Sequence, residues 1–115
     1  MRLDTKAVDG REGMMEALAE HFKVFSEPSR LLVLQCLRQG PLNVTAVVER
    51  TGLSQALVSK HLKLLMIAGV VRRRPEGSLV FYEVIDSNVF QLIAACQDLL
   101  LAARRQQLDA LSTSL

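Results

Sequence analysis

Polar side chains follow one face of a short segment near the middle of this 115-residue chain. Between Ser54 and Lys63 the apolar residues recur three and four positions apart, which predicts a helix with one buried stripe. The opposite face carries Ser54, Gln55, Ala56, Ser59, Lys60 and Lys63. Gln pairs with adenine, Ser with several bases and Lys with phosphate, so this face suits a DNA groove. The alternative is an ordinary helical hairpin within a core.

Two short helices joined by a glycine turn would present this face. Asn43 is a suitable N-cap for the first helix, and Gly52 supplies the left-handed residue that ends it. Ser54 then caps the second helix, which we expect to extend to Ala68. This arrangement is a helix-turn-helix, with the second helix as the recognition helix.

A β-hairpin is expected directly after the recognition helix. Val70–Arg74 and Leu79–Val84 are β-branched or aromatic runs, and Pro75–Ser78 joins them as a turn. Positive charge is concentrated at the hairpin's entry, on Arg72, Arg73 and Arg74. We interpret these arginines as contacts to phosphates or to the minor groove. The alternative is an edge strand that charge protects from aggregation.

The two ends of the chain carry apolar seams. The seam of the first helix suits either the core or a second subunit, whereas no later element follows the last helix to bury its seam. The first helix presents Met15, Leu18, Phe22 and Phe25 at helical spacing. The last, expected over 87–111, alternates spacings of four and three in Val89, Ile93, Cys96 and Leu100. Burying each large aliphatic side chain is worth about 1.5–3 kcal/mol. We therefore expect a homodimer that pairs these helices.

Composition limits the remaining choices. The chain is 50% hydrophobic and only 4% aromatic, so we expect one globular domain (14–112) with an aliphatic core, preceded by a flexible arm (1–13). Its apolar runs are too short for a membrane span, and it lacks a signal-peptide pattern, which favours a cytoplasmic protein. We find no constellation of acid, base and nucleophile, and no site that implies a cofactor, so we expect no enzyme.

Four motifs together resemble the ArsR/SmtB family of winged-helix repressors. They are F-S-E-P-S-R-L-L-V-L, L-S-Q-A-L-V-S-K-H-L-K-L-L, A-G-V-V-R-R-R-P-E-G and V-F-Y-E-V, and they span Phe25 to Val84 in the family's order. The resemblance implies a mainly α fold with a small β-hairpin, dimerising through its first and last helices. It also implies a repressor that leaves its operator when an effector binds or a thiol is modified. By position, Gln55, Ala56, Ser59 and Lys60 match the family's groove-facing residues.

A dimeric helix-turn-helix protein of this kind would bind double-stranded DNA at an imperfect inverted repeat. Its half-sites would lie about one helical turn, roughly 34–36 Å, apart. A winged helix that binds a protein partner instead is the main alternative. That module would use the same polar face, and its affinity would depend little on salt.

The resemblance does not identify a metal effector. The positions of the family's arsenic and cadmium thiolates hold Asn43 and Thr45, which cannot replace them. Of the family's zinc positions in the last helix, Asp86 remains, but Asn88 replaces the His, and Leu99 and Ala102 fill the others. We therefore expect no metal site, and we interpret His21 and His61 as surface or partly buried residues.

Two cysteines leave a thiol effector open. Some relatives sense persulfide or oxidants with one Cys in the second helix and one in the last, where Cys36 and Cys96 lie. Here both are displaced from those relatives' positions, and a one-residue shift rotates a helical side chain by about 100°. Both also lie on apolar stripes, and free Cys is among the most buried residue types. Core packing and redox sensing remain alternative readings of this pair.

Overall fold

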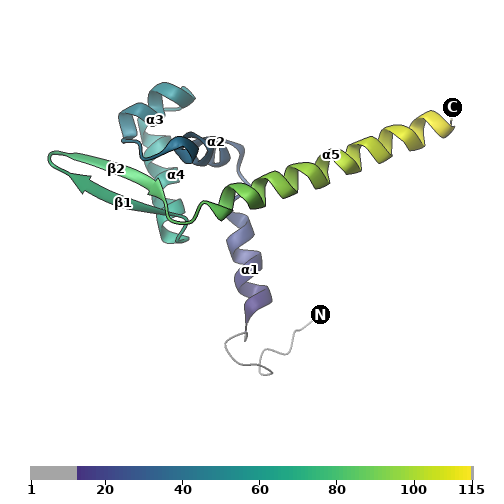
Figure 1. The fold of residues 1–115 in the computed structure, drawn as a ribbon, viewed down its shortest axis with the longest axis horizontal. Coiled ribbons are helices and arrows are strands. Elements are labelled where there is room, and N and C mark those ends of the chain that lie inside the picture. The colour runs from purple at the N-terminus through teal and green to yellow at the C-terminus, as the bar shows by residue number, and fades with distance from the viewer. Residues whose placement is uncertain (1–12, 115) are drawn as a thin grey trace. The chain divides into compact units, whose positions relative to one another are not determined.

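A computed structural model describes residues 13–114 of the chain (Figure 1). They divide into two compact units, Met1–Ile85 and Asp86–Leu115, which are described separately. Apart from Gly13, the predicted N-terminal arm lies outside the described residues. The elements of the first unit are α1 (Met14–Lys23), α2 (Pro28–Cys36), a 3-10 turn (Leu37–Gln39), α3 (Val44–Thr51), α4 (Gln55–Ile67), β1 (Val71–Glu76) and β2 (Leu79–Val84). The second unit contains α5 (Asn88–Ser114).

Local capping begins and ends the helices where the sequence predicts. The Ala46 N–H donates to Asn43 Oδ1 at 2.9 Å, and the Leu57 N–H donates to Ser54 Oγ at 3.2 Å. Gly52 has φ 73°, the left-handed conformation that ends α3 and is nearly free of strain only in glycine. The helix-turn-helix is therefore confirmed at both of its caps and at its turn.

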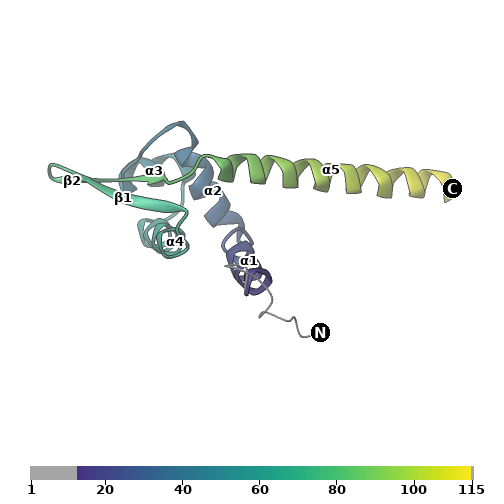
Figure 2. The same ribbon diagram turned by 60° about the horizontal axis from the view of Figure 1, so that its bottom comes forward.

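Aliphatic side chains from α2, the 3-10 turn, α3, α4 and the start of the hairpin form the core of the first unit. The buried residues are Val33, Leu34, Leu37, Val47, Val58, Leu62, Leu65, Val70 and Val71. Helices α2, α3 and α4 contact one another, and β1 contacts α4. Figure 2, in which α4 is seen nearly end-on, shows these elements gathered on one side of it. The opposite side of α4 is left exposed.

The two strands form an antiparallel hairpin in which Val71 pairs with Val84 and Glu76 with Leu79. The predicted turn over Pro75–Ser78 is wrong, because pairing continues through Pro75 and Glu76 and only Gly77 and Ser78 connect the strands. Pro75 is tolerated there because β1 is an edge strand, where a proline costs no ladder hydrogen bond on its open side. The other side of β2 is bridged by Leu42, whose N–H and C=O bond to Tyr82 at 3.0 and 2.8 Å.

Helix α5 forms the second unit and runs three residues past the predicted end at Leu111. At 1.5 Å per residue its 27 residues extend about 40 Å. None of them is buried, and Leu99 is 72% exposed. Among residues 13–114, no helix is both long enough and apolar enough to span a membrane.

Candidate nucleic-acid interface

Helix α4 and its N-cap Ser54 expose every residue of the predicted groove face. Its buried stripe of Val58, Leu62 and Leu65 anchors the helix to the core. The residues predicted to face DNA are all exposed: Ser54, Gln55, Ala56, Ser59, Lys60 and Lys63. Within residues 13–114, neither lysine forms an ion pair, so both ammonium groups are available to phosphates. We call these six residues the groove face.

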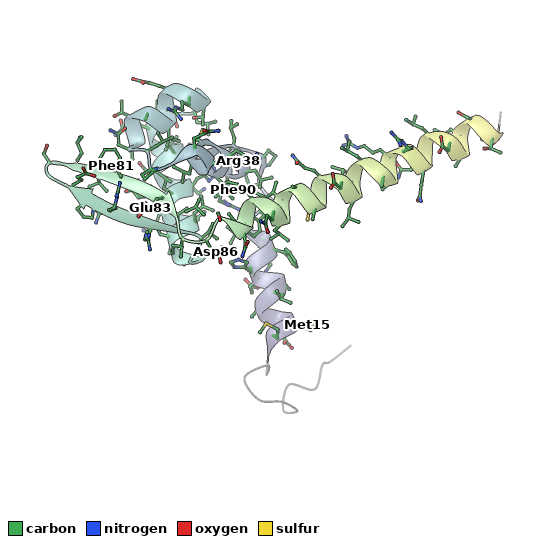
Figure 3. The ribbon with its side chains drawn as sticks, viewed as in Figure 1. Met15, Arg38, Phe81, Glu83, Asp86 and Phe90 are labelled. Atoms are coloured by element: carbon green, nitrogen blue, oxygen red, sulfur yellow. The ribbon has the colours of Figure 1, made fainter. Side chains whose placement is uncertain are left out.

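The three hairpin arginines are not equivalent, although the sequence suggested one positive cluster. Arg72 Nε lies 2.9 Å from Glu83 Oε1, and Arg74 lies 4.0 Å from the same carboxylate and 3.7 Å from Glu76. Figure 3 shows Glu83 on β2 of the hairpin. Arg73 pairs in register with Tyr82, on the other face of the hairpin, and forms no ion pair with any described residue. Arg73 is thus the uncompensated positive charge of the hairpin.

A buried polar cluster behind the groove face was missed by the sequence reasoning. His61 is 2% exposed, so its interpretation as a surface or partly buried residue is wrong. Its Nε2 lies 2.6 Å from Ser29 Oγ and 3.2 Å from Glu27 Oε2. Ser29 and Glu27 lie 32 and 34 positions away along the chain, so no local spacing signalled this cluster. His21, by contrast, is exposed, with its ring edge against Phe25.

The cluster shifts the pKa of both titratable members. Burial lowers the pKa of His61, and it outweighs the nearby Glu27 carboxylate, which favours the protonated ring. The positive charges of Arg30 and Lys60 lower it further. The hydrogen bond from Ser29, supported by the Arg30 N–H, lowers the pKa of Glu27. Near neutral pH the cluster therefore contains a neutral imidazole and an ionised carboxylate.

Arg30 has the specific partner expected of a cation in the first turn of a helix, where the dipole opposes it. Its Nε donates to the Val24 carbonyl at 2.7 Å and its guanidinium also reaches the Lys23 carbonyl at 3.3 Å. These carbonyls lie at the end of α1, so Arg30 ties α1 to the start of α2.

Beside Arg30, a groove of about 510 Å³ is lined by residues of α1 and of the C-terminal end of α4.

The two thiols differ in environment. Cys36 is half-buried, and burial raises the pKa of its thiol, with Arg50 opposing the shift. A raised pKa leaves less of the thiol as reactive thiolate, so we expect Cys36 to react slowly. Cys96 is exposed in the single chain, so only a second chain could bury it.

Among residues 13–114, no group of three or more His, Cys, Asp or Glu side chains could hold a metal ion.

The predicted dimer residues are largely uncovered in the single chain. Met15, labelled on α1 in Figure 3, is 54% exposed and Phe22 is 52% exposed. Leu18, Cys96 and Leu100 are also exposed, whereas Val89 and Ile93 are half-buried. Phe25, which the sequence reasoning placed on the same seam, lies beyond the end of α1.

Comparison with known proteins identifies the family. A sequence model described as "Bacterial regulatory protein, arsR family" matches residues 27–73. An uncharacterized HTH-type transcriptional regulator of Methanocaldococcus jannaschii is 35% identical over 85 residues, 73% of this chain and 96% of the relative. The biofilm growth-associated repressor of Xylella fastidiosa is 28% identical over 92% of this chain and 96% of its own length.

A solved structure is similar over most of the fold. It is the homodimeric winged helix-turn-helix DNA-binding domain Mb0332 of Mycobacterium bovis, described as a possible ArsR-family transcriptional regulator. It is 26% identical with a TM-score of 0.71, and the match covers 85% of this chain and 94% of that one. Together with the two capped helices and the hairpin, these matches show that the chain belongs to the ArsR family of bacterial transcriptional regulators.

Proposed function

We propose that this protein is a homodimeric transcriptional repressor that binds double-stranded DNA through α4 and leaves its operator when an effector binds. The observation that carries the proposal is the groove face, whose six residues are exposed on a helix anchored by its opposite side. A helix positioned in this way enters the major groove with its N-terminal residues toward the bases. Gln55, next to the N-cap, is the best placed to read a base.

The hairpin supplies a smaller electrostatic contribution. Only Arg73 is free of a carboxylate among the described residues, so it is the arginine we assign to the phosphate backbone. Arg72 and Arg74 would have to leave Glu83 before contacting DNA. We expect their contributions to affinity to be smaller for that reason.

Dimerisation explains the apolar surface of the terminal helices. Helix α5 carries leucines that are more than half exposed, including Leu99 and Leu100, and a second copy of this chain is the partner that would cover them. The related M. bovis domain is described as homodimeric. A dimer would present two groove faces to an imperfect inverted repeat, with half-sites about 34–36 Å apart.

Two substitutions on the groove face test the assignment. Gln55→Ala should relax preference at one base position and cost about 1–3 kcal/mol there. Lys60→Ala should weaken binding to all sequences alike and lower the salt slope by about one unit. The measurement is affinity for a panel of operator variants at several salt concentrations.

Lys23→Ala is the charge-matched control, because Lys23 is an exposed cation on α1 that pairs with Glu20. It should leave base preference and salt slope unchanged. Identical behaviour of Gln55→Ala and Lys60→Ala across the panel would show that the groove face is assigned wrongly. An unaltered affinity in both would favour a winged helix that binds protein.

A further inference from the structure

His61 lies on the recognition helix but cannot touch the DNA that the helix would read. At about 100° per residue, it points about 160° away from Ser59 and Lys63 of the groove face. It is buried beside Leu62 and Leu65, on the side of α4 that contacts α2. Any effect of His61 on DNA binding must therefore act through the placement of α4.

The hydrogen bonds of the cluster define its protonation state. The Ser29 hydroxyl donates to Glu27 Oε2, so Ser29 Oγ is left to accept from His61. The imidazole therefore carries its proton on Nε2. Its Nδ1 is buried, and no described residue hydrogen-bonds to it. No acceptor among the described residues lies within hydrogen-bond distance of Nδ1, so a proton added there would form an unpaired, buried N–H.

The charges around the ring oppose one another. Glu27, just before α2, favours protonation of His61, whereas Arg30 on α2 and Lys60 on α4 disfavour it. Burial is the largest influence and also disfavours the charged ring, which is why the pKa of His61 is lowered. Protonation is therefore easier once the ring has left the cluster, because only the buried ring has a lowered pKa.

We propose that neutral His61 is a positioning residue for operator binding, whose hydrogen bond to Ser29 holds α4 against the start of α2 in the orientation that reads DNA. At low pH the His61 ring becomes protonated when it has left the cluster, and this favours the state in which the hydrogen bond to Ser29 is broken. The proposal rests on the proposed function, since it concerns the same recognition helix. We call the cluster closed when His61 is hydrogen-bonded to Ser29. If the protein binds DNA only with this cluster closed, its apparent dissociation constant equals the intrinsic constant divided by the fraction of protein in the closed state.

The test exploits the fact that the chain has two histidines, one buried and one exposed. Operator affinity is measured from about pH 8 to about pH 5, a range that brackets the ordinary histidine pKa of 6.5. Wild type and H21Q should both lose affinity as the pH falls, by up to about tenfold per pH unit below 6.5 for each subunit. H61Q keeps an N–H donor near the Nε2 position but cannot titrate, so its affinity should stay nearly constant.

Ser29→Ala provides a second variant that leaves α4 itself unchanged. It removes the acceptor for His61, so the closed cluster is less favoured and the loss of affinity should begin at higher pH than in wild type. Its salt slope should stay at the wild-type value, because no phosphate contact is removed. A circular dichroism spectrum at each pH confirms that the measured protein is folded.

The outcomes separate this proposal from the function on which it rests. If wild type does not bind DNA at pH 8, the proposed function fails. If wild type binds but its pH profile is flat, or H61Q falls as steeply as wild type, the positioning role of His61 is overturned. If H61Q does not fold, Ser29→Ala decides: a wild-type pH profile would overturn the proposal, and a profile shifted to higher pH would support it.

Discussion

The first unit, which contains the helix-turn-helix and the hairpin, differs from helix α5 in how its apolar side chains are buried. In the first unit, Leu34, Leu62 and Leu65 of two helices are almost completely buried by the chain itself. In α5 no residue is buried, and the large apolar side chains of Leu99, Leu100 and Leu101 are each more than half exposed. Exposed apolar surface on this scale marks an interaction site. The core of the first unit is therefore stabilised within one chain. We propose that a second chain covers α5, together with the exposed side chains of α1.

The largest effect should come from a charge on the apolar surface of α5. Leu100→Glu would bury an unpaired carboxylate in the proposed dimer interface, at a cost of about 3–5 kcal/mol per subunit. We expect sedimentation to show a monomer at micromolar concentration, with operator binding lost. An unmodified protein that sediments as a well-folded monomer would contradict the proposed role of α5.

The matched change in the other unit should behave differently. Leu62→Ala leaves a cavity in the core and should cost about 2–5 kcal/mol of folding free energy. Because Leu62 contacts only its own chain, the protein that remains folded should still be a dimer. If Leu62→Ala produced a folded monomer, the two regions would not be independent in the way proposed.

The reactivity of the two cysteines also compares the two units, because Cys36 lies in the first unit and Cys96 lies on α5. Burial raises the pKa of Cys36, so its alkylation should be slow in both wild type and Leu100→Glu. Cys96 should react slowly in the dimer and faster in the Leu100→Glu monomer, where it is exposed. Equal reactivity of Cys96 in both proteins would place it outside the interface.

Redox sensing is tested with the same residues. Cys36→Ser should lower stability modestly without changing any response to oxidants, and Cys96→Ser should be the only substitution able to abolish such a response. DNA affinity before and after mild peroxide or polysulfide is the measurement. A Cys36–Cys96 cross-link found by mass spectrometry would instead make this a thiol-responsive repressor that uses both residues.

The smallest expected effect is that of metals. Zinc, cadmium and arsenite should not release the protein from DNA, because the family's ligand positions hold Asn43, Thr45, Asn88, Leu99 and Ala102. The measurement is operator binding with and without each metal at stoichiometric concentration. Release by sub-micromolar metal would refute this expectation and would redirect attention to the thiols and histidines.

Local chemistry made much of the fold predictable, and long-range contacts limited the rest. The caps at Asn43 and Ser54 and the turn at Gly52 involve residues within four positions, so the sequence specified them. The hairpin turn was placed two residues too early, since it depends on the pairing of β1 with β2. The ion pair in which Glu83 neutralises the charge of Arg72 also depends on this strand register.

The burial of His61 shows the limit most clearly. Its position on the edge of the α4 apolar stripe fits either a surface or a buried residue. Only the packing of α2 against α4 brings Ser29 within 2.6 Å of its ring. Exposure of the groove face was predictable because it follows from helical period, but the polar support behind it was not.

The salt dependence of operator binding tests the central claim most directly. We predict that the protein binds DNA from upstream of its own gene as a dimer. The logarithm of the affinity should fall linearly with the logarithm of salt concentration, with a slope of about −0.9 for each phosphate contacted. A protein that binds this DNA with no dependence on salt, or does not bind it at any salt concentration, would contradict the assignment of α4 as a DNA-reading helix.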